Sequence, residues 1–405
     1  MPIRIGIIGK TNAGKTTLFN SMTLQTAEIS NYPFTTKSPN VGMAEAVTLC
    51  VHKEFGVQDN PKNSRCEEGW RFIPIEVTDL PGLIKGAYMG KGLGNQFLAV
   101  AAQSDALLHV VDASGSVDKE GRVTETGTGD PIADFADVEL ELVLWYTKMF
   151  SGNMGKIAKA AKQPGGDMSS AIADVMQGIG VRKEHVSFAL KEALLEGKDI
   201  EDWNEKETQN FCWILRDVSK PTLIIANKMD LPNAAENFKK LREHYKDLIV
   251  VPTSGEAELS LRRAEAKGLI KYVPGEERFD VVKPQGLSDA QRTALAYIKR
   301  KVFGEYLRTG VQFALSITIF KLLKMNAIYP VADPEKLTDK SGNVLPDVYL
   351  LPTGSTLDDL ARTVHSDLHK GLLYAVDVRT GIHLPTDYVL RDRDVLSLVS
   401  TARRG

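Results

Sequence analysis

The chain has 405 residues, of which 43% are hydrophobic and 25% charged, and its formal net charge is −2. This length predicts two or three domains with substantial cores, and the near-zero charge excludes a whole-molecule attraction to DNA, RNA or anionic membranes. No apolar run approaches the roughly 18 residues of a membrane helix, and the N-terminus resembles a buried strand, not a signal peptide. We therefore expect a cytoplasmic protein with no membrane and no DNA partner.

The first predicted strand, residues 4–8, leads into a loop rich in glycine and then into a predicted helix near residue 18. Two glycines followed by a Lys-Thr pair form the phosphate-loop pattern in its strand–loop–helix context. Such a loop surrounds a phosphate with backbone N–H groups at a helix N-terminus. We predict that Lys15 reaches the β- and γ-phosphates and that the Thr16 hydroxyl binds magnesium. The predicted nucleotide-binding residues of this loop are Gly9, Asn12, Ala13, Gly14, Lys15, Thr16 and Thr17.

Four more apolar runs predict strands that are buried on both faces, at residues 72–77, 106–111, 222–226 and 248–251. Continuous apolar runs separated by helices are typical of a parallel α/β sheet, in which ligands bind at the carboxyl ends of the strands. A polar cluster ends every run, for example at Asp79, Asp112 and Asn227. The fold class that we predict is therefore α/β, with a P-loop NTPase domain built on a mainly parallel sheet from residues 1–130 and 221–308.

Three isolated cysteines, Cys50, Cys66 and Cys212, form no C-x-x-C pair. Cysteines of this kind are typical of small buried hydrophobic residues in a reducing compartment. We predict that role for all three, and a redox-active role is the less favoured alternative.

The 114 residues between Asp112 and Asn227 exceed what one crossover helix needs. Helical spacing of apolar residues predicts helices at 137–150, 181–196 and 208–218, with an interruption at 163–167. We predict a helical insert over residues 131–220, which could be simple scaffolding.

Three short motifs that follow predicted strands carry nucleotide chemistry. Asp79, in Asp-Leu-Pro-Gly, could hold magnesium, while the N–H of Gly82 could face the γ-phosphate. The next motif, Asn227-Lys228-Met-Asp230, selects guanine because the Asp230 carboxylate can accept from both N1–H and the 2-amino group, a donor pair that adenine lacks.

The third motif, Ser254-Gly255-Glu256, offers a backbone N–H to the guanine O6. All these motifs occur in the expected order, each after its own strand. They predict a domain that binds GTP and GDP together with Mg²⁺.

Residues 261–308 are predicted to be helical and hold eleven Lys or Arg against six Asp or Glu. A solvated helix face is the simpler explanation of this charge, and RNA contact is the alternative. From residue 325 to 405, short strands around one predicted helix at 356–365 indicate a compact α+β domain. This segment holds nine basic against eleven acidic residues, so bare electrostatics gives it no attraction to RNA.

Two segments resemble switch regions of the Obg family of translation-factor-class GTPases. Asn31-Tyr-Pro-Phe-Thr-Thr36 with Pro39-Asn-Val-Gly42 resembles that family's switch I, and Lys91-Gly-Leu-Gly-Asn-Gln-Phe-Leu98 resembles its glycine-rich switch II. The resemblance implies that Thr36 is the switch threonine that closes on magnesium.

The C-terminal segment around Leu351-Pro-Thr-Gly-Ser-Thr-Leu-Asp-Asp-Leu360 resembles the TGS domain, a β-grasp module that is also found in threonyl-tRNA synthetase. The order of GTPase domain, helical insert and TGS domain is similar to the YchF (Obg-like ATPase) branch. This resemblance implies a ribosome or RNA partner, reached through the TGS domain and the basic 261–308 stretch. Well-known YchF members have a degraded guanine motif and prefer ATP. Since this chain keeps the motif at 227–230 intact, it looks like the GTP-preferring archaeal and fungal relatives of that branch.

Position 83 bears on catalysis, because small GTPases place a water-orienting Gln just after the Asp-x-x-Gly motif. Leu83 cannot orient water, so we predict slow intrinsic hydrolysis. Asn12 sits where related GTPases hold a potassium ion that bridges the phosphates; alternatively, Asn12 only shapes the loop. The predicted catalytic residues are Lys15, Asn12, Thr36 and Gly82.

The leading prediction is a GTP-hydrolysing molecular switch that works with ribosomes. The alternative is a nucleotide-gated adaptor with negligible hydrolysis. This alternative remains because Leu83 cannot orient the attacking water. A metabolic P-loop kinase is disfavoured because no acceptor-substrate site is visible in the sequence.

Overall fold

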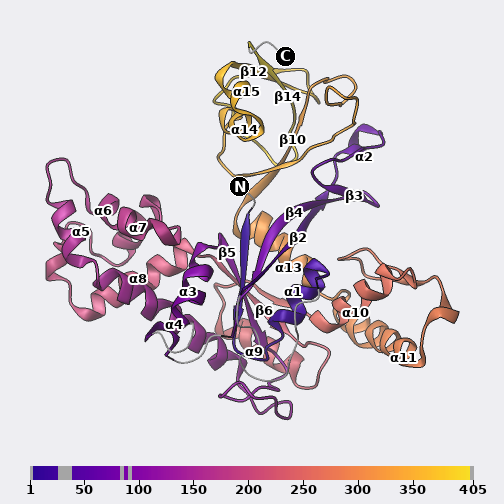
Figure 1. Cartoon of the computed structure of the whole chain (residues 1–405), viewed down its shortest axis with the longest axis horizontal. Coiled ribbons are helices and arrows are strands. Elements are labelled where there is room, and N and C mark those ends of the chain that lie inside the picture. The colour runs from indigo at the N-terminus through magenta and orange to yellow at the C-terminus, as the bar shows by residue number, and fades with distance from the viewer. Residues whose placement is uncertain (1–2, 26–38, 83–85, 90–93, 402–405) are drawn as a thin grey trace. The chain divides into compact units, whose positions relative to one another are not determined.

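In the computed structural model, residues 3–25, 39–82, 86–89 and 94–401 are described. The chain divides into two compact units, shown in Figure 1. Unit 1 comprises Met1–Ala44 and Glu76–Ala314, and unit 2 comprises Glu45–Ile75 and Leu315–Gly405. The predicted helical insert thus shares a unit with the sheet. Segment 45–75 groups with the C-terminal residues because Val51 and Ile73 pack in one core with Tyr329.

A seven-stranded sheet runs in the order β2-β4-β1-β5-β6-β7, with β3 paired to β4. Its strands are β1 (Arg4–Gly9), β2 (Asn40–Leu49), β3 (Arg65–Glu67), β4 (Trp70–Asp79), β5 (Ala106–Asp112), β6 (Thr222–Asn227) and β7 (Val250–Pro252). The pairs β1–β4, β1–β5, β5–β6 and β6–β7 are parallel. The predicted mainly parallel sheet is therefore confirmed.

Strands β5 and β6 are buried at every residue, as expected of apolar runs that are covered on both faces. All five predicted strands exist, and their bounds differ from the predictions by at most a few residues. Strand β2 was not predicted, because its first residues fall in the segment interpreted as a switch region. Its burial alternates along much of its length, as in a strand with one solvated face.

Helices cover the sheet of unit 1. They are α1 (Lys15–Thr23), α3 (Gly94–Gln103), α4 (Pro131–Ser151), α9 (Ala234–His244), α10 (Gly255–Ala266) and α13 (Val311–Ile317), the last of which continues past the end of the unit. Helix α4 begins where it does because the Asp130 side chain accepts hydrogen bonds from the N–H groups of Ile132 and Ala133, with Pro131 at the first helical position. Among the described residues, no helix is long and apolar enough to cross a membrane.

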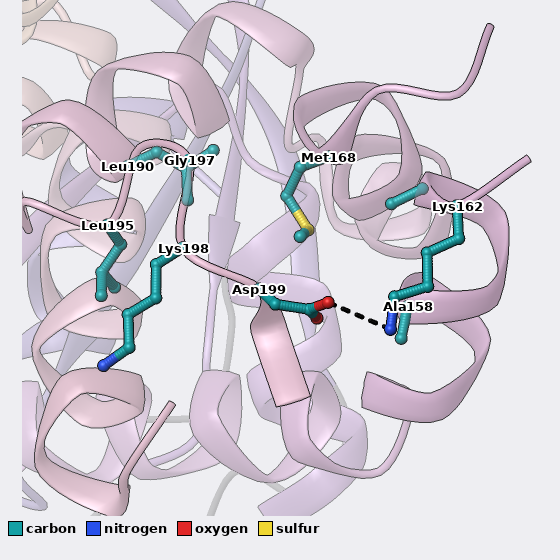
Figure 2. A pocket seen from close by; sticks show the side chains of 9 residues that line it. Ala158, Lys162, Met168, Leu190, Leu195, Gly197, Lys198 and Asp199 are labelled. Carbon is teal, nitrogen blue, oxygen red and sulfur yellow. Dashed lines mark ion pairs between the residues drawn. The ribbon is translucent and has the colours of Figure 1, made fainter. Parts of the chain in front are cut away.

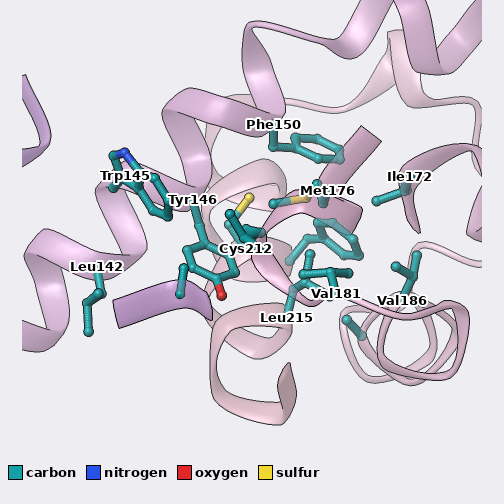
Figure 3. Close-up of a cluster of buried hydrophobic side chains, with 14 of the residues drawn as sticks. Leu142, Trp145, Tyr146, Phe150, Ile172, Met176, Val181, Val186, Cys212 and Leu215 are labelled. Carbon is teal, nitrogen blue, oxygen red and sulfur yellow. The ribbon is translucent and has the colours of Figure 1, made fainter. Parts of the chain in front are cut away.

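The insert is a helical lobe whose helices gather beside α4 in Figure 1. They are α5 (Met154–Ala161), α6 (Met168–Met176), α7 (Lys183–Glu192) and α8 (Glu205–Ser219). The lobe shares one core with α3 and α4, in which Phe150 and Tyr146 are fully buried near Cys212, as Figure 3 shows. The three helices predicted here exist, and the predicted interruption at 163–167 separates α5 from α6. The two short helices α5 and α6 were not predicted.

The prediction that residues 261–308 are helical throughout is wrong for the segment from 270 to 281. Strands β8 (Ile270–Lys271) and β9 (Asp280–Val281) form an antiparallel pair between α10 and α11 (Asp289–Tyr297). The physical reason is the pair Pro274-Gly275 between the strands, where Gly275 has φ 93° and Pro cannot continue a helix.

Unit 2 contains a five-stranded sheet in the order β11-β10-β14-β12-β13. Its elements are α2 (His52–Phe55), β10 (Met325–Val331), β11 (Tyr349–Pro352), α14 (Leu357–Val364), α15 (Ser366–Lys370), β12 (Leu372–Asp377), β13 (His383–Leu384) and β14 (Val395–Ser400). Leu357 and Leu360 of α14 pack against Ile328 and Leu396 of the sheet. This arrangement of strands around a main helix confirms the predicted C-terminal α+β domain.

Candidate functional site

Two glycines let the loop between β1 and α1 approach its neighbours closely. Gly9 has φ 142°, and a Cβ there would lie 2.2 Å from the backbone oxygen of Val110. Gly14 has φ 98°, and a Cβ there would lie 2.3 Å from Nδ2 of Asn227. Any larger residue would force the loop away from β5 and from Asn227. The loop is therefore packed so tightly against its neighbours that only glycine fits at these two positions.

Lys15, the first residue of α1, is almost entirely buried, with 7% of its surface exposed. Its Nζ donates to the backbone oxygen of Lys10 at 2.8 Å. Burial lowers the pKa of Lys15 to about 8, and the nearby Asp79 carboxylate opposes that shift. A buried ammonium group held against the loop's own backbone is suited to receive phosphate oxygens.

Thr16 and Asp79 form the oxygen pair that the sequence predicts for magnesium. The Thr16 hydroxyl donates to Asp79 Oδ2 at 2.7 Å, and the Asn40 side chain donates to the same oxygen at 3.4 Å. Asp79 is fully buried, and its Oδ1 accepts no hydrogen bond from any described residue. Burial raises the pKa of Asp79, while Lys15 opposes the rise. A partly buried hydroxyl beside an unsatisfied, buried carboxylate oxygen fits a hard cation with oxygen ligands. Thr36 and Leu83 lie outside the described residues.

The Asn227 side chain at the end of β6 joins two predicted motifs. Its Nδ2 donates to the backbone oxygen of Ala13 at 3.0 Å, and its Oδ1 accepts from the N–H of Gly255 at 3.1 Å. Ser254 is 1% exposed, whereas Glu256 is exposed. One amide therefore fixes the phosphate loop and the Ser254-Gly255 turn relative to each other.

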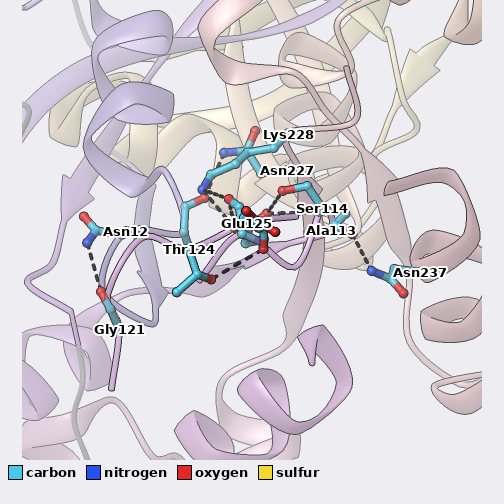
Figure 4. A network of polar contacts seen from close by, with 12 residues as sticks. Asn12, Ala113, Ser114, Gly121, Thr124, Glu125, Asn227, Lys228 and Asn237 are labelled. Atoms are coloured by element: carbon cyan, nitrogen blue, oxygen red, sulfur yellow. Dashed lines mark hydrogen bonds and ion pairs between the residues drawn. The ribbon is translucent and has the colours of Figure 1, made fainter. Parts of the chain in front are cut away.

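Lys228 is held by the end of β5. Its Nζ donates to Asp112 Oδ2 at 2.9 Å and to the Ser116 hydroxyl at 3.1 Å. Asp112 is itself fixed by the N–H and hydroxyl groups of Ser114 and Ser116 at 2.6–3.0 Å. Figure 4 shows Lys228 and Ser114 close together in this network. Lys228 also has φ 63°, so the ion pair compensates for an unfavourable backbone conformation.

Asp230 lies at the surface end of the same motif and is partly exposed. The Tyr297 hydroxyl, from α11, donates to the backbone oxygen of Asp230 at 2.6 Å. This contact fixes the backbone of the motif beside the Asp230 carboxylate, the group that the sequence predicts to meet guanine.

A loop at residues 113–130 contacts the phosphate loop. The Asn12 side chain donates to the backbone oxygen of Gly121 at 2.9 Å, as Figure 4 shows. Lys10 forms an ion pair of 2.6 Å with Asp134 of α4. Gly82 packs so closely on the phosphate loop that a Cβ would lie 2.4 Å from the Thr11 hydroxyl. The loop at 113–130 and α4 thus help to shape the predicted phosphate site.

Hydrogen bonds and close packing join the predicted phosphate loop with Asp79, Gly82, Asn227 and Gly255, whereas Glu256 is exposed. Sequence reasoning missed the groups that position them: Asp112 with Ser114 and Ser116, Tyr297, and the Lys10–Asp134 pair. The signal for Asp112 was present, since it ends a predicted strand and serines follow at 114 and 116. Nothing local in the sequence indicates that Tyr297 contacts Asp230, 67 residues away.

A separate cavity of about 270 Å³ lies within the helical lobe, as Figure 2 shows. Its lining includes Met168, Leu195 and Lys198, together with the ion pair of 3.0 Å between Lys162 and Asp199. It contains none of the predicted nucleotide-site residues, so it is distinct from the candidate site.

Three protein families match successive segments of the chain. Residues 4–134 match the family described as "50S ribosome-binding GTPase". Residues 225–333 match "Obg-like GTPase YGR210-like, G4 motif-containing domain", and residues 338–400 match "TGS domain".

Similar proteins cover nearly the whole chain. A GTP-binding protein of Methanocaldococcus jannaschii is 41% identical, over 98% of this chain and 99% of its own length. The protein named "Ribosome-binding ATPase YchF" of Bacillus subtilis is 30% identical, over 80% of this chain and 83% of its own. A crystal structure of a GTP-binding protein from Pyrococcus horikoshii is similar, with a TM-score of 0.79 and 35% identity, and covers 98% of this chain and 100% of its own.

Proposed function

The chain belongs to the YchF/Obg-like family of P-loop GTPases, and we propose that it is a GTP-hydrolysing molecular switch that works with ribosomes. The observation that carries this proposal is the bridging position of Asn227, whose side chain bonds both to Ala13 in the phosphate loop and to Gly255. A site built in this way holds the phosphates and the base of one nucleotide in a fixed relation.

The proposed preference for GTP over ATP rests on Asp230. The Tyr297 hydroxyl bonds to the backbone oxygen of Asp230, and the side chain of Lys228, two residues earlier, bonds to Asp112. These contacts fix the backbone that carries the Asp230 carboxylate. Guanine presents two N–H donors to such a carboxylate, and adenine does not. The relatives named as ATPases make this a point to test directly.

Magnesium fits the Thr16–Asp79 pair, where it would supply charge neutralisation for the phosphates. In this arrangement Thr16 and Asp79 would supply oxygen ligands to the ion, Lys15 would bind phosphate oxygens, and the Gly82 N–H would face the γ-phosphate. Thr36 is the third residue that we propose to bind the metal ion. We propose slow intrinsic turnover because Leu83 carries no group that orients water.

Asn12 has a second possible role besides the proposed binding of potassium. The hydrogen bond from Asn12 to Gly121 and the positive φ of 61° at Asn12 support a role in shaping the loop. Either role keeps Asn12 at the phosphate site.

Ribosome association is supported by the names of relatives and by the family matched at residues 4–134. The TGS domain and the basic 261–308 stretch are the proposed contact surfaces, and this role would be exercised in the cytoplasm. Within that stretch, Arg292 pairs with Asp289, Lys301 with Glu305, and Arg308 with Glu277. The acids of these pairs are already counted in the balance of eleven basic to six acidic residues, whereas the TGS segment holds more acidic than basic residues. We therefore propose the basic stretch as the surface to examine first.

Two measurements test the proposal. GTP and ATP turnover are followed with and without purified ribosomes, and co-sedimentation with ribosomal subunits is compared in the GTP-analogue and GDP states. We expect GTP turnover that ribosomes stimulate and association that depends on the nucleotide. Nucleotide-dependent association without turnover under any condition would indicate the adaptor instead, and equal association in both states would contradict a switch.

A further inference from the structure

Four side chains of unit 2, none of them a predicted nucleotide-site residue, bring metal-ligating atoms together. Cys50 follows β2, His52 begins α2, Asp59 lies in the loop after α2, and Cys66 lies in β3. One nitrogen, one oxygen and two sulfur atoms of these residues all lie within 4.8 Å of one another. Cys50 and Cys212 are free and buried, as predicted, and Cys66 is free and partly buried. Cys212 lies in an apolar core, whereas Cys50 and Cys66 have polar neighbours in Asp59 and His52.

Three of the six distances between these atoms are close to the edges of a tetrahedron around a metal ion, and all the ligand atoms lie within 4.8 Å of one another. Cys50 Sγ lies 3.2 Å from Asp59 Oδ2, and that oxygen lies 3.4 Å from His52 Nδ1. Cys66 Sγ lies 3.4 Å from the same His52 nitrogen. Usual zinc–ligand bonds give tetrahedral edges of about 3.3–3.8 Å. An ion would therefore enter with only small movements of the side chains.

Burial and charge also fit an enclosed cation. Cys50 is 3% exposed, Asp59 8% and His52 9%. Two thiolates and one carboxylate around a divalent cation leave one negative charge. The fully buried Arg71 places Nη1 3.6 Å from Asp59 Oδ2 and can balance that charge. Among the described residues, Nε and Nη1 of Arg71 donate no hydrogen bond, so this buried guanidinium lacks a full set of acceptors.

We propose that Cys50, His52, Asp59 and Cys66 bind one Zn²⁺ ion in a closed structural site. Thiolate and imidazole ligands favour zinc over magnesium, and four protein ligands are typical of a structural site with no open catalytic position. Binding releases the two thiol protons to solvent, and no electron is transferred. The site is chemically distinct from the oxygen pair of Thr16 and Asp79.

Within unit 2, the ion would link the end of β2 with α2 and β3. Val51, beside the first ligand, and Ile73, beyond the last, pack in the core that contains Tyr329. The loop between the ligands also bonds to the C-terminal part of the unit, for example from the N–H of Asn60 to the oxygen of Val344 at 2.8 Å. Zinc removal should therefore destabilise unit 2, since metal affinity contributes directly to folding at such sites.

The test uses the full chain, purified under reducing conditions with any affinity tag removed. Zinc is removed with a chelator, replaced from buffered Zn²⁺, and counted by elemental analysis. Co²⁺ is added to a second sample as a spectroscopic probe of tetrahedral thiolate coordination. We expect about one zinc per chain, a cobalt spectrum with thiolate charge-transfer bands, and a lower Tm after chelation that zinc restores.

The matched variants are the double substitution Cys50→Ser with Cys66→Ser, and the control Cys212→Ala. The double variant should lose the zinc and the cobalt bands, while the control keeps both. Circular dichroism and a cooperative thermal transition report whether each variant is folded, and if the double variant does not fold, His52→Gln replaces it. Three outcomes each overturn the proposal: no zinc binding by a wild-type chain with three free thiols, a Cys50–Cys66 disulfide in the reduced preparation, or zinc that persists in a folded variant.

Discussion

Lys228 Nζ and Asp112 Oδ2 form an ion pair of 2.9 Å between residues that lie 116 positions apart in the chain. Asp112 has almost no exposed surface, and two serines saturate its oxygens. The lysine of the guanine motif is thus positioned by the end of a neighbouring strand.

Asp112→Asn should weaken GTP and GDP binding about tenfold or more, because hydrogen bonds to charged groups contribute about 1.5–3 kcal/mol. Calorimetric titration measures the change. Glu120→Gln, which makes the same change at an exposed position of the loop at 113–130, should leave the affinity as in the wild type. Equal losses in the two variants would mean that overall charge, not the position of Lys228, sets the affinity.

Asp230→Ala should relax base choice. Loss of a charge-assisted pair with guanine predicts about a tenfold to hundredfold fall in GTP affinity, with little change for ATP. Competition between the two nucleotides for a fluorescent analogue measures the ratio. An unchanged preference for GTP would rule out the assigned role of Asp230.

Lys15→Ala should abolish tight triphosphate binding, because Lys15 is the fixed cation of the loop that we assign to the β- and γ-phosphates. The fold should persist, as judged by circular dichroism. The exposed Lys119 provides a control in Lys119→Ala. Binding of GTP by Lys15→Ala within a few-fold of wild type would contradict the assignment.

Stability should depend on pH through Asp134. Burial raises the pKa of this carboxyl from 3.8 to about 6, and Lys10 opposes the rise. Between these values the folded chain keeps a proton that the unfolded chain releases, so the contribution of Asp134 to stability falls as pH rises through about 4 to 6. The difference between the Tm of the wild type and that of Asp134→Asn should therefore shift against the wild type as pH rises over this range. A constant difference in Tm would show that Asp134 does not titrate there.

Potassium should stimulate GTP turnover more than sodium does, starting from a basal rate well below the roughly 1–100 s⁻¹ of kinases. A cation beside Asn12 would stabilise charge that develops on the phosphates. Asn12→Ala should then erase the difference between the two ions while sparing nucleotide affinity. Leu83→Ala should change basal turnover little. If the difference between potassium and sodium persists in Asn12→Ala, the bond from Asn12 to Gly121 would be the whole role of this side chain.

Much of the fold follows from local sequence patterns. The apolar runs that became β1, β5 and β6 could be recognised because a strand buried on both faces must be apolar along its whole length. The phosphate loop could be recognised because two glycines a few residues apart adopt positive φ angles within one short turn, 142° at Gly9 and 98° at Gly14. In both cases the physical constraint acts on neighbouring residues, so a short window of sequence contains it.

Other features were decided only by tertiary structure. Tyr297 reaches Asp230, and Lys228 reaches Asp112, because the sheet order sets which strand ends and helices are neighbours. The cluster of Cys50, His52, Asp59 and Cys66 likewise has no regular spacing in the sequence. Its members meet because a helix and a short strand fold back on the end of β2. Contacts between distant segments depend on topology and packing, and no local pattern encodes them.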